Sequence, residues 1–514
     1  MTGPHPAQSA VRGPQPAVLT APGAILLVAC YELGRQPLSL AWPAAYLERA
    51  GYAPAAVDAA VDELTDDALR RARLIAFATP MHTALRLAVR LMARARAVNP
   101  AAHRCAFGLY AGLNADYLLR AGLVDTVLSG EVEAALVELA GAIERGAGYP
   151  HPDPLPQRGR GNGAPSGEGV AAAPAPPPAR PVLGSPAPPL PRSPAPILRR
   201  LDLPTPRRAG LPPLERYARL VWQGETRLAG AAESTRGCRH TCRHCPLTPI
   251  YRGRFFAVPV ATVLADIRQQ VAAGARHISF GDPDFLNGPT HALHVARALH
   301  AEFPAVTFDA TIKIEHILKQ RALFPELRAL GCIFVVSAVE SLSDEVLRRL
   351  DKGHTRADVM AALAVLDEAG IALRPSLLAF TPWTTLADYL ALLDWVEAEG
   401  LAEHVDPVHF AIRLLIPPGS ALLEQPETAT WLGELDAANL TYTWRHPDPR
   451  MDELHAAVAA LVEQAARQRW PATATLAAIR ALAESLAGHR SRDRSGGVAV
   501  RRAPPPRLTE TWFC

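Results

Sequence analysis

The sequence has few cysteines and no long apolar run. Its seven cysteines in 514 residues are an odd number that cannot all pair within one chain, which argues against a secreted disulfide framework. No run approaches the roughly 18 apolar residues that span a membrane. The apolar run at residues 24–30 is followed by Tyr31-Glu32-Leu33 rather than by a cleavage site of small residues, so it predicts a buried strand and not a signal peptide. We therefore expect a cytoplasmic protein without a membrane partner.

A strong charge of one sign is also missing. The formal net charge is +3 and the pI is about 8.5, which is too mild to indicate nucleic acid as the main partner. No face that interleaves basic with aromatic residues is evident either. Hydrophobic residues make up 49%, which is enough for large cores and excludes a wholly disordered chain. Proline is the one residue type in marked excess. The 49 prolines are about double the usual share, so we expect one segment to be rich in proline.

Residues 23–146 alternate short apolar segments with segments of helical spacing. This order is typical of a doubly wound parallel sheet, similar to Rossmann and flavodoxin folds, in which ligands bind beyond the carboxyl ends of the strands. The expected strands lie at residues 25–30, 52–58, 74–78, 105–110 and 124–128.

Residues 147–206 account for much of the proline excess. The stretch 171–196 is mostly Ala, Pro and Arg and cannot bury enough apolar area to offset the entropy of ordering. We therefore predict a disordered, Pro/Ala-rich linker, which is either a passive tether or a PxxP-type docking segment.

Residues 213–425 alternate again between strand and helix patterns and predict a partial (β/α)6 barrel, with its active site at the carboxyl ends of the strands. Residues 427–488 are expected to form a helical C-terminal region, and residues 489–514 a flexible basic tail that ends in cysteine. The fold class is therefore α/β. The expected barrel strands lie at residues 231–234, 277–280, 307–312, 334–338, 373–378 and 408–412.

Three of the cysteines, Cys238, Cys242 and Cys245, form a CxxxCxxC pattern directly after the first expected barrel strand. Clustered thiolates are soft ligands that suit zinc or an iron–sulfur cluster. A structural zinc site needs a fourth ligand, and His240 or His244 would strain the loop to supply it. Three cysteines suit a four-iron cluster with one iron left open.

This pattern at the start of a partial βα barrel resembles the radical SAM superfamily. The resemblance implies that Cys238, Cys242 and Cys245 hold a [4Fe–4S] cluster whose open iron binds S-adenosylmethionine. Reductive cleavage then gives a 5′-deoxyadenosyl radical, which abstracts hydrogen from an unknown peptide or small metabolite. The resemblance also implies an electron donor such as flavodoxin or ferredoxin. His244 stands where the family usually has an aromatic residue and would lie near the adenine.

Other cofactor contacts are implied at the ends of the second and third barrel strands. Gly281 and Asp282 occupy the family's Gly-Gly-Glu-like turn, so their backbone carbonyls would hold the methionyl amino group, with Asp284 as an acidic contact. Lys313 and Glu315 share one face and would meet the ribose or carboxylate, or would pair with each other.

The later strands carry further candidates. Ser337 and Glu340 resemble the residues with which the family contacts the ribose and the carboxylate of S-adenosylmethionine. Arg374 and Arg413 are cations on otherwise apolar strands, so each would either clamp a carboxylate or form a structural ion pair.

A doubly wound domain before such a barrel resembles cobalamin-binding radical SAM proteins. The Asp-x-His-x-x-Gly loop of many cobalamin domains does not occur in residues 1–145, although members of this group often omit it. Cobalamin is therefore an optional third cofactor, and cobalamin-dependent methyl transfer is the alternative reaction. The alternative outside enzymes is an iron–sulfur or zinc redox-responsive binding protein.

The remaining cysteines divide into two groups. Cys30, Cys105 and Cys332 lie in or next to expected strands and are predicted to be small buried residues. Cys514 follows Trp512 and Phe513, and this ending resembles radical SAM proteins with a CUAEP or CCAEP tail. The resemblance implies a selenoprotein whose selenocysteine codon follows Cys514 and a redox-active, catalytic Cys514; an ordinary C-terminal cysteine is the alternative.

Overall fold

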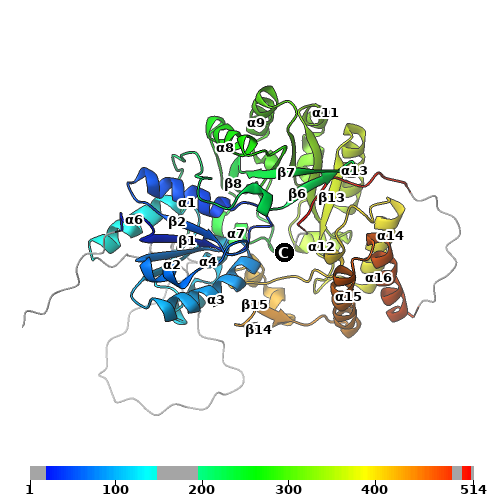
Figure 1. Ribbon diagram of the computed structural model, residues 1–514. Helices are drawn as coiled ribbons and strands as arrows, with labels where there is room; N and C mark the ends of the chain where they lie inside the picture. The colour runs from blue at the N-terminus through cyan, green and yellow to red at the C-terminus, as the bar shows by residue number, and fades with distance from the viewer. Residues whose placement is uncertain (1–18, 147–194, 489–499, 511–514) are drawn as a thin grey trace, which may run out of the picture.

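The computed structural model describes residues 19–146, 195–488 and 500–510, which form two α/β units packed side by side (Figure 1). The predicted linker at 147–194 and the predicted catalytic Cys514 lie outside the described residues. Within the described ranges, no helix is long and apolar enough to cross a membrane.

The N-terminal unit is the predicted doubly wound domain. Its five parallel strands have the order β2-β1-β3-β4-β5, with helices covering both faces. Helices α1 and α6 pack on one face, and α3 and α5 pack on the other. The strands are β1 (Ile25–Ala29), β2 (Ala55–Asp58), β3 (Leu74–Ala78), β4 (His103–Phe107) and β5 (Thr126–Leu128). The helices are α1 (Leu38–Arg49), α2 (Asp66–Arg71), α3 (His82–Val98), α4 (Leu109–Leu113), α5 (Ala115–Arg120) and α6 (Glu133–Glu144).

The second unit is a half-barrel of seven strands in the order β13-β12-β11-β10-β7-β6-β16. The five strands from β7 to β13 in this order are parallel, while β6 and β16 add an antiparallel edge. The strands are β6 (Arg219–Trp222), β7 (Glu225–Ala232), β10 (His277–Phe280), β11 (Thr307–Thr311), β12 (Cys332–Glu340), β13 (Ala372–Leu377) and β16 (Arg507–Leu508). The helices outside it are α8 (Val260–Ala272), α9 (Pro289–Glu302), α10 (Ile314–Lys319), α11 (Phe324–Ala329), α12 (Asp344–Arg349), α13 (Arg356–Ala369) and α14 (Leu386–Ala398).

The predicted sixth barrel strand at residues 408–412 is wrong. The structure has a 3-10 helix, η4 (Pro407–Phe410), and only one bridge beyond it, between Phe380 and Arg413. Pro407 has no N–H to give to a ladder, and the Tyr389 hydroxyl donates a hydrogen bond to the Phe410 carbonyl at 2.9 Å. The half-barrel therefore stays open beyond β13.

The region 427–488 is helical only from its middle onward. It begins with an antiparallel hairpin, β14 (Leu432–Asp436) and β15 (Thr441–Trp444), before α15 (Pro449–Gln468) and α16 (Ala472–Leu486). The segment Thr-Tyr-Thr-Trp is made of residues that favour strands, which the helical prediction overlooked.

Two segments that were predicted to be flexible pack against the fold. Residues 195–206 belonged to the predicted linker, but Ile197 accepts a hydrogen bond from Glu131 N at 2.7 Å and donates one to Ser129 O at 2.9 Å. Residues 500–510 belonged to the predicted tail, but β16 pairs with β6 there. In both segments the backbone finds partners on an existing sheet edge or loop, which composition does not reveal.

Candidate active site

The cysteine loop lies between β8 (Thr235–Gly237) and α7 (Leu247–Tyr251), with β8 paired to β9 (Phe255–Ala257). Gly237 has φ +76°, and a Cβ there would come within 2.5 Å of the Arg254 carbonyl oxygen. Glycine is therefore required where the chain turns into Cys238.

We expect Gly237→Ala to lose most of its cluster, because the loop must move to relieve that contact. Iron content after anaerobic reconstitution measures this effect. Gly224→Ala is the matched control, since Gly224 has φ +77° but no atom near its missing Cβ. Equal iron in the two variants would contradict the prediction.

The cysteine loop is held in shape by hydrogen bonds at Cys242. Cys242 is buried, and its carbonyl accepts hydrogen bonds from Cys245 N at 3.1 Å and from Thr248 Oγ1 at 2.7 Å. Burial raises the pKa of Cys238 to about 11 and that of Cys245 to about 12, so both thiols hold their protons until a metal displaces them.

A buried charge triplet lies beside the loop. Glu340 is the last residue of β12. One of its carboxylate oxygens, Oε1, lies 3.1 Å from His244 Nε2 and 3.2 Å from Lys352 Nζ. Burial alone would raise the pKa of Glu340, but Lys352 and His244 hold it well below its usual range. Burial would lower the pKa of Lys352, but Glu340 and the sulfurs of Cys242 and Cys245 raise it. The lysine therefore stays positive beside the thiols.

The turn after β10 lies against the start of the cysteine loop. The Asp282 carboxylate accepts hydrogen bonds from Ser234 N, Ser234 Oγ and Thr235 Oγ1, so the side chain is fully used and only its backbone is left for a ligand. Gly281 lines the space in front of this turn. The use of the Gly281 and Asp282 backbone carbonyls by a ligand stays a prediction.

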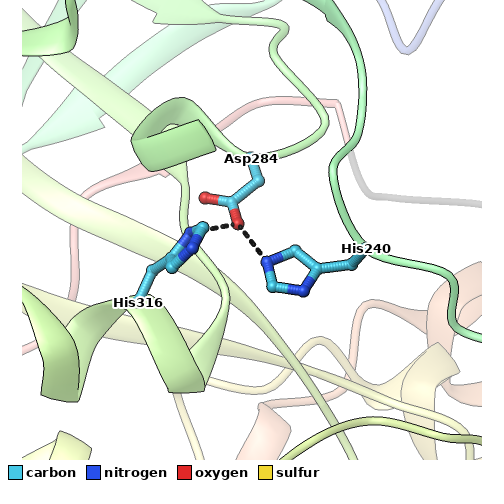
Figure 2. Close-up of side chains that lie close together, drawn as sticks. All are labelled: His240, Asp284 and His316. Atoms are coloured by element: carbon cyan, nitrogen blue, oxygen red, sulfur yellow. Dashed lines mark ion pairs between the residues drawn. The ribbon is translucent and has the colours of Figure 1, made fainter. Parts of the chain in front are cut away.

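Asp284 instead faces two histidines (Figure 2). Its Oδ2 lies 2.6 Å from His316 Nδ1 and 3.6 Å from His240 Nε2. On the other side of His240, Nδ1 lies 3.1 Å from Lys313 Nζ and 3.6 Å from Glu315 Oε2. Burial and Lys313 lower the pKa of His240 to about 4. Lys313 and Glu315 also pair with each other at 3.4 Å, which was one of the two predicted alternatives.

Three of the predicted cofactor contacts have other orientations or protein partners in the structure. Ser337 lies between Val335 and Val339 on the face of β12 that packs under the helices, away from the barrel interior. Arg374 pairs with Asp406 at 2.7 Å. Arg413 pairs with Asp452 at 2.7 Å and lies over the Trp444 ring. The strand period of two directs Ser337 away from the barrel interior, so its predicted contact with the ribose or carboxylate does not fit this orientation. Arg374 and Arg413 form structural ion pairs, which was one of the two predicted alternatives for each. Arg413 also lines a cavity of about 520 Å³ together with His244 and Glu340.

The N-terminal domain is joined to the cysteine loop by buried ions. Arg236 in β8 contacts Glu133 at 2.7 Å and Glu131 at 3.2 Å, while Tyr251 OH donates to the other oxygen of Glu131 at 2.8 Å. Glu233 adds a third carboxylate at 3.0 Å from Arg236. The Arg236 guanidinium is therefore the positive centre of a largely buried acidic cluster at the domain boundary.

Burial raises the pKa of Glu233 from 4.5 to about 7, although Arg236 acts in the opposite direction. Because the folded-state pKa exceeds the unfolded one, the stabilising contribution is complete at low pH and is lost as the pH rises towards about 7. We expect the urea midpoint to fall between about pH 5 and pH 7, and Glu233→Gln to flatten that slope. A slope that Glu233→Gln leaves unchanged would refute this assignment.

Two joined cavities lie between the carboxyl edge of the N-terminal sheet and the cysteine loop. Their volumes are about 520 Å³ and 300 Å³, and they share Leu33, Pro80 and Met81. His244 lines the larger cavity and Gly237 the smaller one, so both cavities border the cysteine loop. Such a cleft can hold a broad, largely apolar ligand against the loop.

Sequence reasoning missed three groups that contribute to this site. Arg236 directly precedes the cysteine loop, and its two most deeply buried partners, Glu131 and Glu133, lie more than a hundred residues away in the sequence. Lys352 is far from the cysteines in the sequence, and only the fold brings it close to Cys242 and Cys245. His316 follows the third barrel strand within the first turn of α10, and its position at a strand's carboxyl end was the signal for it.

With this geometry established, comparison with known families identifies the domain. Residues 232–395 match the Radical SAM superfamily, so the half-barrel is a radical SAM domain. This domain implies a [4Fe–4S] cluster and S-adenosylmethionine and indicates an enzyme. Curated relatives include a tRNA-2-methylthio-N(6)-dimethylallyladenosine synthase of Chlorobium luteolum, 29% identical over 35% of this chain and 42% of that protein. Another is the ribosomal protein uS12 methylthiotransferase RimO of Geobacter sulfurreducens, 28% identical over 31% of this chain and 38% of that protein.

The chain thus spans less than half the length of these relatives, whereas the structural likeness extends over both of its units. The cobalamin-dependent S-adenosylmethionine radical enzyme OxsB, solved with aqua-cobalamin, covers 84% of this chain with a TM-score of 0.62 at 14% identity; the match spans 66% of OxsB. The radical S-adenosylmethionine methyltransferase TsrM from Kitasatospora setae covers 72% with a TM-score of 0.53 at 17% identity, and the match spans 70% of TsrM. The described part of the chain therefore has a fold similar to those of these two enzymes.

Proposed function

We propose that this protein is a radical SAM enzyme in which Cys238, Cys242 and Cys245 hold the [4Fe–4S] cluster. When bound, the cluster and S-adenosylmethionine would supply radical chemistry, with a flavodoxin or ferredoxin as the electron donor and a peptide or small metabolite as the substrate. The observation that carries the proposal is that all three cysteines lie on one short loop, held by hydrogen bonds at Cys242, whose neighbouring residues Gly237 and His244 line the interdomain cleft.

The surrounding residues have defined tasks in this proposal. Lys352 keeps a positive charge next to the thiolates, which offsets part of the negative charge of a reduced cluster. Glu340 orients the His244 ring at the cleft wall, where a flat ring suits an adenine. The backbone carbonyls of Gly281 and Asp282 accept hydrogen bonds from the methionyl amino group. The N-terminal domain covers the cleft and keeps bulk water from a radical.

The assay for this function is formation of 5′-deoxyadenosine. Anaerobically reconstituted protein is mixed with S-adenosylmethionine and dithionite, and the nucleoside is quantified by chromatography. We expect product that depends on both the cluster and the reductant. Protein that keeps its iron but forms no 5′-deoxyadenosine would instead support the redox-responsive binding protein.

We also propose that the cleft binds cobalamin. The larger and smaller cavities together offer the apolar walls that a corrin face needs, at the sheet edge where doubly wound domains bind ligands. In the smaller cavity Glu133 Oε2 is buried and has no hydrogen-bond partner among the described residues, so it can accept an amide N–H from a corrin rim. Cobalamin would supply a methyl carrier, and methyl transfer to carbon is then the alternative outcome of the reaction.

Binding of cobalamin can be separated from turnover. We expect the full chain to retain hydroxocobalamin through gel filtration, seen by its visible absorption. Met81→Trp fills the part shared by both cavities and should weaken retention at least about tenfold while the iron content stays unchanged. Leu87→Trp is the control, because Leu87 is exposed on the helix that follows Met81. Equal retention in both variants would place the cobalamin elsewhere or exclude it.

A further inference from the structure

Three side chains from separate elements converge next to the cysteine loop. His240 comes from the loop itself, Asp284 from the turn after β10, and His316 from the first turn of α10 (Figure 2). One ligand atom from each lies within 4.8 Å of the others. Two imidazoles and one carboxylate form the donor set that suits divalent first-row transition metals and leaves open positions on the ion.

The polar atoms of this cluster are buried without adequate partners. Asp284 is 1% exposed and His316 4% exposed. Asp284 Oδ1 accepts a hydrogen bond from Leu286 N at 3.1 Å, but Oδ2 has no hydrogen-bond partner among the described residues, and neither has His316 Nδ1 or His240 Nε2. His316 Nδ1 lies 2.6 Å from Asp284 Oδ2 without the alignment of a hydrogen bond. Three unpartnered atoms that face one point are costly to bury unless a shared ligand satisfies them.

We propose that His240, Asp284 and His316 bind a divalent transition-metal ion such as Zn²⁺, separate from the cysteine-bound cluster. Metal–ligand bonds of about 2.1 Å place neighbouring donors roughly 3 Å apart, close to the 2.6 Å and 3.6 Å observed around Asp284 Oδ2. This site does not rest on the proposed radical chemistry, because it uses none of the three cysteines.

Glu315 and Lys313 contact His240 at Nδ1, the ring nitrogen that faces away from the proposed metal. Glu315 Oε2 lies 3.6 Å from His240 Nδ1, on the nitrogen opposite the metal, so it can accept the Nδ1 proton and hold the ring with its Nε2 lone pair towards the ion. Lys313 Nζ lies 3.1 Å from the same Nδ1 and must turn towards Glu315 when the metal binds. Its positive charge opposes a cation, so Lys313 sets the affinity of the site.

The test measures zinc in the full chain with its cluster in place and without S-adenosylmethionine. After equilibrium dialysis against Zn²⁺, elemental analysis is expected to find about one zinc per chain beside the cluster iron. His316→Ala and Asp284→Ala should each weaken zinc binding at least about tenfold with the iron retained. His291→Ala is the matched control. His291 is partly buried, and its Nε2 forms a hydrogen bond with the Ser234 carbonyl rather than facing His240, Asp284 and His316. Zinc binding that is equal in wild type and His316→Ala overturns the proposal.

Two further variants separate this site from its neighbours. Lys313→Met should tighten zinc binding severalfold, an effect that does not depend on whether His316→Ala folds; unchanged or weaker binding contradicts the proposal. The variant with Cys238, Cys242 and Cys245 all changed to Ala should lose its iron but still bind zinc. Loss of zinc from that variant would show that the cysteines hold it, and would overturn the proposal while leaving the proposed radical function untouched.

Discussion

Cys242→Ala is expected to abolish the iron–sulfur cluster and, with it, all cleavage of S-adenosylmethionine. Two thiolates cannot hold a four-iron cluster with three of its corners on protein. The substitution should not unfold the loop, because Cys242 anchors it through its backbone carbonyl, which alanine keeps. Iron per chain and 5′-deoxyadenosine formation after reconstitution are the measurements, with about four irons expected in wild type.

Cys332→Ala is the matched control for this result. Cys332 is fully buried in β12 under the helices, and its thiol donates to the Phe334 carbonyl, far from the cysteine loop in sequence. We expect this variant to lose some stability but to keep its iron and its activity. Cluster iron that survives in Cys242→Ala, or disappears equally in Cys332→Ala, would contradict the assignment of the cluster ligands.

Arg236→Met is expected to destabilise the protein strongly, by about 3–5 kcal/mol in the free energy of unfolding. The Arg236 side chain is 10% exposed, and those of Glu131 and Glu133 are 2% and 4% exposed. Removing the guanidinium leaves these carboxylates buried together without a cation. Urea denaturation followed by tryptophan fluorescence measures the change in the free energy of unfolding.

Arg227→Met provides the comparison. Arg227 pairs with Glu225, whose side chain is 60% exposed, so this loss should cost about 1 kcal/mol or less. Equal shifts in the two variants would mean that the cluster around Arg236 contributes no more than a surface ion pair. A larger shift for Arg236→Met would confirm that the domain boundary is stabilised by buried charge.

Most of the architecture was predictable because it depends on local patterns. The strands of the N-terminal sheet and the parallel strands of the half-barrel are short apolar runs between helices of regular spacing, and this order alone indicates parallel sheets. The cysteine spacing predicts a cluster-binding loop for the same reason: all three cysteines lie within eight consecutive residues, so no long-range contact had to be inferred.

The parts that could not be predicted depend on partners distant in sequence. Nothing near Arg374 or Arg413 reveals that Asp406 and Asp452 satisfy them, and nothing near Arg236 reveals Glu131. The meeting of His240, Asp284 and His316 requires the register of β10 against β11, which sequence periodicity does not supply. Composition likewise marked residues 195–206 and 500–510 as linker and tail, because it does not register backbone hydrogen bonds to a neighbouring edge.

The pairing of β16 with β6 has a consequence for handling this protein. β6 would otherwise present a row of unpaired backbone groups at the edge of a seven-stranded sheet, and such edges recruit strands from other molecules. The two residues of β16, with Thr509 N donating to Arg219 O at 2.8 Å, protect that edge. Any truncation that removes residues 500–510 would therefore first be noticed as aggregation during purification, before any change in catalysis was measured.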